Sequence, residues 1–249
     1  MFRFPVIHAI CARPILLLVL PASFMFAAGP AKRQPPGISV VRWTEGAPGS
    51  TFSRTPDGKY VYDLKNGSIE IAITIDSQEL EKVRHRPLPV FAVRLNAQYS
   101  GQQSFELSPD PITLEFVSHY QVISEVLDPD ELARRIQNDI DSVGDETEHE
   151  VRKHPEKKQE QESLLQSHLK DMTELVGFVS LYGLRGTTLN HDNSATGGWI
   201  FFSANSKWIG KWKSQEQFLL RMPVEDRIFE FPFALPPRKG DMSLRRRPD

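Results

Sequence analysis

Two groups of histidines and acids are the first candidates in this chain for metal binding or acid–base chemistry. In the first group, His149 and Glu150 are followed by His154, close to the His-Glu-x-x-His pattern of zinc metalloprotease helices. Because the second histidine comes five residues after the first instead of four, the two imidazoles would lie about 140° apart around a helix, too far for one zinc ion. His168 would join them only if a following helix folded back in register. We predict solvated histidines on a charged helix and no metal site.

The second group lies in a polar loop, where His191 and Asp192 are followed by Ser194 and Thr196. These side chains can in principle support acid–base or nucleophilic catalysis. A catalytic triad also needs an oriented base and an oxyanion hole, and the Gly-x-Ser-x-Gly turn that often carries the nucleophile is absent. Ordinary turn chemistry explains residues 190–198. We expect no enzymatic activity and no cofactor; the alternative is a hydrolase or metal-dependent enzyme that uses the loop or helix histidines.

A third segment combines aromatic and basic residues around Gly210 and is suited to binding. The candidate binding residues are Trp199, Trp208, Trp212, Lys207 and Lys211. Exposed tryptophans beside lysines can hold a glycan, a peptide or an anionic headgroup by stacking and cation–π contacts. The alternative is that the tryptophans fill the end of a β-sandwich while the lysines extend outward into solvent.

Strands are the main elements that must position these residues. The clearest strand spans residues 69–76, where isoleucines alternate with polar or small residues after an Asn66-Gly67 turn. Residues 90–95 are apolar on both faces, as in a central strand. Further strands are expected at 38–43, 59–64, 112–116, 178–184, 199–203, 218–222 and 228–233. In the last of these, Pro232 predicts a position at a sheet edge or near the strand's end.

A helical insertion interrupts the strands. Asp128 is a predicted N-cap with proline and glutamate in the positions typical of a helix start, and Gly144 is the predicted end of that helix. Residues 145–163 are almost all polar, and helical spacing returns from Leu164 to Val176. Acids outnumber bases about two to one across the insertion. This charge indicates a solvated helical face or, alternatively, an acidic docking surface.

The N-terminus has the layout of a secretory signal peptide. Arg3 and Arg13 precede an apolar run of about 13 residues, which is too short to span a bilayer, and small residues follow. We therefore expect an exported protein, periplasmic or extracellular, with no integral membrane span after cleavage. Cys11 lies in this leader, so the mature chain would have neither a disulfide nor a cysteine nucleophile. A net charge of −2 argues against nucleic acid as a partner.

Together these patterns predict a mainly β fold, an immunoglobulin-like β-sandwich with an inserted helical segment; a barrel is the second choice. The expected boundaries are a signal peptide at 1–31, an N-terminal linker and first strand at 32–58, the first part of the sandwich at 59–127, the charged helical insertion at 128–176, the second part of the sandwich at 177–237 and a disordered basic tail at 238–249.

Three segments also carry a resemblance to a known group of proteins. They are Asp128-Pro129-Asp130-Glu131-Leu132, Gly198-Trp199-Ile200-Phe201-Phe202 and the stretch Phe229-Glu230-Phe231-Pro232-Phe233-Ala234-Leu235-Pro236-Pro237. With them, residues 60–237 resemble uncharacterised bacterial exported proteins with an extracellular immunoglobulin-like domain. The resemblance implies a fold and no catalytic residues.

The prediction is therefore a non-enzymatic exported module that binds a protein or a cell-envelope component. A purely structural reading, in which the insertion packs on a neighbouring subunit, remains a further alternative.

Overall fold

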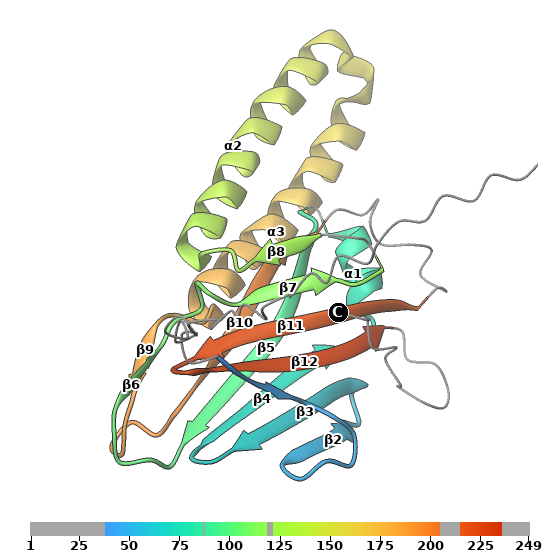
Figure 1. Ribbon diagram of the computed structural model, residues 1–249. Coiled ribbons are helices and arrows are strands. Elements are labelled where there is room, and N and C mark those ends of the chain that lie inside the picture. The colour runs from blue at the N-terminus through green and yellow to red at the C-terminus, as the bar shows by residue number, and fades with distance from the viewer. Residues whose placement is uncertain (1–37, 87, 119–121, 205–214, 236–249) are drawn as a thin grey trace, which may run out of the picture. The chain divides into compact units, whose positions relative to one another are not determined.

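The computed structural model describes residues 38–86, 88–118, 122–204 and 215–235 (Figure 1). This part of the chain is mainly β, with 42% of its residues in strands and 32% in helices. The strands are β1 (Ser39–Arg42), β2 (Ser50–Arg54), β3 (Lys59–Asn66), β4 (Ile69–Asp76), β5 (Val90–Tyr99), β6 (Phe105–Leu107), β7 (Thr113–Phe116), β8 (Ile123–Glu125), β9 (Thr187–Leu189), β10 (Ala195–Ser203), β11 (Glu216–Val224) and β12 (Arg227–Leu235). The helices are α1 (Glu79–His85), α2 (Pro129–Lys153) and α3 (Lys158–Tyr182), and a 3₁₀ turn at Pro155–Lys157 joins α2 to α3. The predicted leader and basic tail lie outside the described residues.

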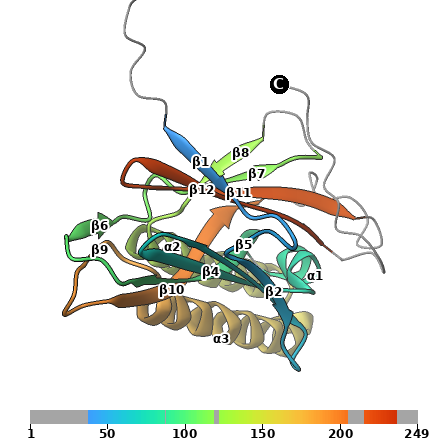
Figure 2. The same ribbon diagram turned by 60° about the horizontal axis from the view of Figure 1, so that its bottom comes forward.

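Two five-stranded sheets and a helical hairpin form three layers (Figure 2). Sheet A has the order β1-β12-β11-β7-β8, and sheet B has the order β10-β5-β4-β3-β2. The pairing of β1 with β12 is parallel, whereas the other pairs within these two sheets are antiparallel. The hairpin of α2 and α3 packs on the face of sheet B that is turned away from sheet A. None of the described helices combines the length and the apolarity needed to cross a bilayer.

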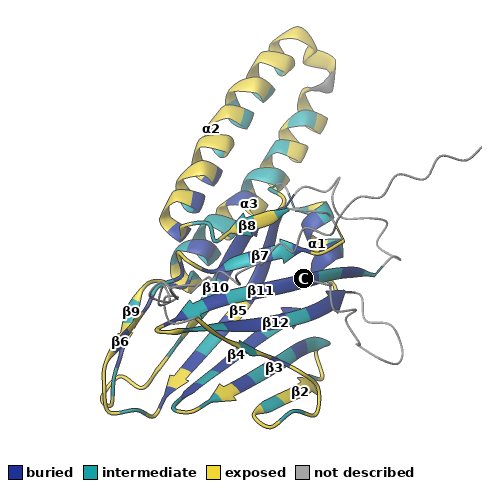
Figure 3. Cartoon of the chain, in the orientation of Figure 1, coloured by how far each residue is buried: buried dark blue, intermediate teal, exposed yellow. Residues whose placement is uncertain are grey.

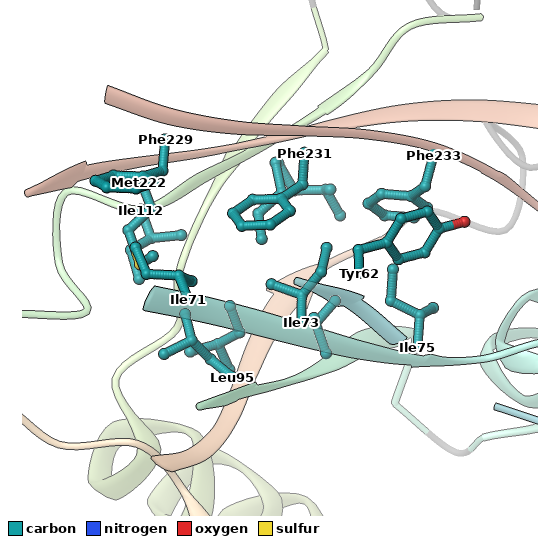
Figure 4. Close-up of a cluster of buried hydrophobic side chains, with 14 of the residues drawn as sticks. Tyr62, Ile71, Ile73, Ile75, Leu95, Ile112, Met222, Phe229, Phe231 and Phe233 are labelled. Carbon is teal, nitrogen blue, oxygen red and sulfur yellow. The ribbon is translucent and has the colours of Figure 1, made fainter. Parts of the chain in front are cut away.

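The core lies between the sheets and is built by the predicted period of two. Along β4, buried and partly buried residues alternate, and Ile71, Ile73 and Ile75 are fully buried (Figure 3). From sheet A, the phenylalanines of β12 point toward these isoleucines (Figure 4). Phe231 is fully buried. The prediction that β4 and β12 each turn one apolar face inward is therefore confirmed.

Strand β5 contacts apolar groups on both of its faces, as predicted. Phe91 and Val93 belong to the core between the sheets. Val90 and Ala92 point the other way and pack with residues of α2, α3 and β10. Because a central strand covered on both sides has no wet face, its apolar residues run without alternation.

The first helix starts where the sequence predicts and ends later. The Asp128 side chain accepts a hydrogen bond from the backbone N–H of Glu131 at 2.7 Å, which confirms the N-cap. The predicted end at Gly144 is wrong, because α2 continues to Lys153. Beyond Gly144, Thr147 and Val151 are partly buried, and the packing of α2 on α3 offsets the cost of about 1 kcal/mol for a glycine inside a helix.

The second helix is also longer than predicted, since α3 continues to Tyr182. The strand expected at 178–184 is therefore wrong. Met172 and Val179 are buried at helical spacing against the outer face of sheet B. The aromatic and β-branched residues after Gly177 favour a strand by composition. In the fold they are helical, because a helix buries Val179 against the outer face of sheet B. The free half of the hairpin is mostly exposed (Figure 3).

Strand β10 begins at Ala195, earlier than predicted, and its outer edge is covered by the two ends of the helical insertion. The backbone N–H of Leu127, just before α2, donates to the carbonyl of Phe201 at 2.8 Å. The N–H of Leu184, just after α3, donates to the carbonyl of Trp199, also at 2.8 Å. A side chain at Gly198 would lie 2.7 Å from the Cα of Leu184, so this close approach requires glycine.

Strand β12 is not an edge strand, since it lies between β1 and β11. Its partner β1 pairs only with Arg227–Glu230 and has ended before Pro232. Within the described chain, Pro232 therefore has no neighbouring strand on the β1 side. The strand as a whole is not at a sheet edge, but the position of the proline is, as a residue without a backbone N–H requires.

Candidate binding pocket

The structure describes one of the predicted binding residues, Trp199. Trp208, Trp212, Lys207 and Lys211 lie outside the described residues. Trp199 is partly buried on β10 and packs with the helical hairpin rather than in the core between the sheets. Trp199 therefore lies outside the core between the two sheets.

The histidines of the helical insertion lie on its two arms. His149 is exposed on α2, and His168 is partly buried on α3. His154, at the end of α2, has its Nδ1 3.3 Å from Oε1 of Glu156. Across the residues that can be placed, no three metal-ligating side chains gather at one point.

The His191 loop is organised as a turn. The side-chain oxygen of Asn190 accepts hydrogen bonds from the backbone N–H groups of Asp192 (2.9 Å) and Asn193 (2.7 Å). His191 and Ser194 are exposed. This is the turn chemistry that the residue types predict.

A pocket of about 280 Å³ lies on the outer face of sheet B, between α1 and α3. Its apolar side consists of Val90, Ala92, Leu175, Phe178, Trp199 and Phe201. The Phe178 ring centroid is 5.4 Å from that of Trp199 and 6.3 Å from that of Phe201. Strands β5 and β10 and helix α3 thus supply an aromatic wall over an aliphatic floor.

The other side of the pocket is charged, and its most deeply buried group is Glu79. Its Oε1 accepts hydrogen bonds from Nη1 of Arg86 at 2.5 Å and from the backbone N–H of Ala92 at 2.7 Å, and its Oε2 lies 3.2 Å from Nη2 of Arg86. Nη1 of Arg86 also donates to the carbonyl of Val90 at 2.5 Å. Burial raises the pKa of Glu79, while the Arg86 guanidinium and the Ala92 amide act against this rise.

Two further cations flank the buried pair. Lys82 donates a hydrogen bond to Asp76, which also accepts one from the backbone N–H of Gln78 at 2.9 Å. Partial burial acts to raise the pKa of Asp76, but these hydrogen bonds outweigh it and hold the pKa below its ordinary value. Lys59 lies 2.6 Å from Asp57, and its hydrogen bond lowers the pKa of Asp57 to about 2.

The charged side depends on α1, which sequence reasoning missed. Glu79, Lys82 and Arg86 follow one another at spacings of three and four, so they share one face of a helix and its last turn. This spacing was the available signal. It was weak because α1 has only seven residues, and the aromatic wall that completes the pocket comes from distant parts of the chain.

The pocket combines paired charges on one side with an apolar wall on the other. Its carboxylates are held in place by cations and backbone amides. The apolar wall and the charged rim together suit a ligand with two chemically different ends. No protein-family model matches the chain, and no curated protein or solved structure matches it.

Proposed function

We propose that this chain is a non-enzymatic, exported, immunoglobulin-like module that binds a component of the cell envelope through the pocket between α1 and α3. The observation that carries the binding function is the pocket itself, in which Trp199 and Phe178 form an aromatic wall opposite a set of ion pairs. Aromatic side chains with a polar group nearby are enriched where proteins bind ligands and partners. The signal-peptide pattern of residues 1–31 supports export.

The strand order supports the immunoglobulin-like assignment. In such folds one sheet pairs the second and fifth strands, and the other sheet holds the third, sixth and seventh. The strands of the two five-stranded sheets are counted here from β4, so that β5 is the second and β10 the fifth, and these two pair in sheet B. The third, sixth and seventh are then β7, β11 and β12, which lie together in sheet A with β8 added beside β7. The helical hairpin then occupies the connection from β8 to β10. The chain differs from antibody domains in that β2 and β3 extend sheet B and β7 carries neither a cysteine nor a tryptophan.

Retention of envelope components by the immobilised full-length chain tests this function. We expect Trp199→Ala and Phe178→Ala to lose a component that the wild type retains, because each removes part of the aromatic wall. Leu181→Ala is the matched control, since Leu181 lies on α3 like Phe178, is 75% exposed and does not line the pocket.

Thermal unfolding of each variant separates loss of binding from loss of fold. His191→Ala tests the enzymatic alternative and should change neither retention nor any hydrolytic activity. Equal retention by the wild type and both wall variants would refute the proposed binding site.

A further inference from the structure

We infer that the pocket takes a ligand with an aromatic body and an anionic group, a carboxylate or a phosphate. This inference rests on the proposed function, because it names the chemical class that the same pocket would bind. It depends on three features of the pocket: which charges a ligand can reach, which hydrogen-bond donors are left over, and the shape of the apolar wall.

The charges that a ligand meets are positive. The side chains of Lys82 and Lys59 are 48% and 38% exposed, and that of Arg86 is 23% exposed. Their acidic neighbours in the lining are more deeply placed, with Asp76 at 16% and Glu79 at 2%. At two of the three cations, Lys82 and Arg86, the acid partner is therefore the less accessible group, whereas Lys59 pairs with Asp57, which is 57% exposed and does not line the pocket; the five charges of the lining nearly cancel.

These cations also keep unused donors. An ammonium group has three N–H bonds, and Lys82 uses one of them on Asp76. A guanidinium group has five, and Arg86 uses three, two on Glu79 and one on the Val90 carbonyl. A carboxylate or phosphate can therefore bind without breaking the ion pairs already present. A cationic ligand would have to displace Lys82 or Arg86 to reach an acid.

The opposite side of the pocket presents aromatic rings to a ligand. Phe178 is inclined to Trp199 by 60° and to Phe201 by 81°, so the wall offers ring edges and faces at steep angles. The volume of about 280 Å³ leaves room for a small ligand, and the aromatic wall favours one with a ring system. Among the described residues, the indole N–H of Trp199 has no hydrogen-bond acceptor, so it can also report on a ligand.

Four probes that share one ring system and differ in charge test the inference. They are 2-naphthoate, 2-naphthyl phosphate, the neutral 2-naphthylmethanol and the cationic 2-naphthylmethylammonium, each titrated calorimetrically into the full-length protein. We expect at least one anion to bind about tenfold more tightly than the alcohol, and the ammonium compound more weakly than the alcohol. The ratio of the two anions distinguishes a carboxylate from a phosphate ligand. Added salt should lower the affinity for the two anions and leave the affinity for the alcohol unchanged.

The position of the probe is tested by nuclear magnetic resonance and by substitution. The protein has four tryptophans, and Trp199→Phe assigns the indole N–H signal that we expect the anion to shift. Lys82→Met should lower the affinity for the anionic probe about threefold to tenfold. The substitution removes one half-exposed positive charge, and Asp76, which loses its partner, then repels the ligand. Lys170→Met is the matched control, since Lys170 is 75% exposed on α3 and does not line the pocket.

Two outcomes would overturn the inference and are distinguishable. If the alcohol or the ammonium probe binds as tightly as the anions and shifts the Trp199 signal, the pocket binds ligands but does not select anions. If no probe binds, or if the Trp199 signal does not move, the ligand class is wrong. In that case, retention of an envelope component that Trp199→Ala abolishes would still support the proposed function.

Discussion

The buried pair of Glu79 and Arg86 gives a sharp test of the energetics around the pocket. In Arg86→Met the guanidinium is lost, and Glu79, which is 2% exposed, keeps the Ala92 N–H as its hydrogen-bond donor among the described residues. Removing one partner of a buried pair costs about 3–5 kcal/mol. Because the Arg86 side chain is 23% exposed, some water already reaches the pair, and we expect a loss at the lower end, about 3 kcal/mol.

The loss should depend on pH in a definite direction. Burial raises the pKa of Glu79, and the substitution removes the cation that opposes this rise. In the variant the folded state therefore takes up a proton at a higher pH than the unfolded chain, whose glutamates titrate near about 4.3. Between these two values the folded state binds more protons, so the stability of Arg86→Met relative to wild type increases as the pH falls from about 7.5 to about 5.

Urea unfolding of the full-length protein at both pH values, followed by circular dichroism, measures these changes. Arg135→Met is the matched control, because Arg135 pairs with Glu131 on the surface of α2, and it should cost less than about 0.5 kcal/mol at either pH. The double variant Glu79→Gln/Arg86→Met buries no charge and should be more stable than Arg86→Met alone. The reasoning is wrong if Arg86→Met costs no more than the control, or if its cost does not shrink toward low pH.

Three further predictions concern the fold. Phe231→Ala should lower the free energy of unfolding by about 3–4 kcal/mol, because Phe231 is fully buried between the sheets; an equal loss for Phe52→Ala, at 39% exposure, would contradict this. Asp128→Ala should cost about 1 kcal/mol through loss of the N-cap, measured by thermal unfolding, and no loss would mean that the cap is not used in solution. Deleting residues 145–163 should leave the unfolding of the sheets unchanged, because none of the described side chains there is buried; a changed oligomeric mass would instead support the subunit-packing alternative.

Sequence periodicity predicted the strands in which the order of apolar and polar residues matches the order of buried and exposed positions. Ile71 and Ile73 mark the inner face of β4, and the uninterrupted apolar residues of β5 reflect its two covered faces. The N-cap at Asp128 was also readable, because its hydrogen bond is local. These predictions needed no knowledge of the rest of the chain.

The errors occur where contacts between distant segments override local preference. Gly144 and Gly177 look like helix ends, yet both lie inside helices that pack on each other or on sheet B. The short elements β2, β6, β8, β9 and α1 were not predicted, since a few residues carry too little periodicity.

The site was predictable in one residue only. Trp199 was singled out by its type, but its neighbours in the pocket come from β3, β4, α1, β5 and α3. Glu79 and Arg86 were not singled out from the sequence, because the strand that buries them follows later in the chain. A pocket made by six separate segments has no signature within any one of them.

The hydrogen bonds that Leu127 and Leu184 make with β10 also bear on self-association. An uncovered strand edge is a template on which identical chains can add and aggregate. At β10 the two ends of the helical insertion occupy the part of that edge around Trp199 and Phe201, so a foreign strand meets a shorter free edge there than next to β2. Substitutions that loosen the chain at either leucine would expose more of this edge. With both contacts intact, the insertion protects the protein from fibre formation independently of anything it binds.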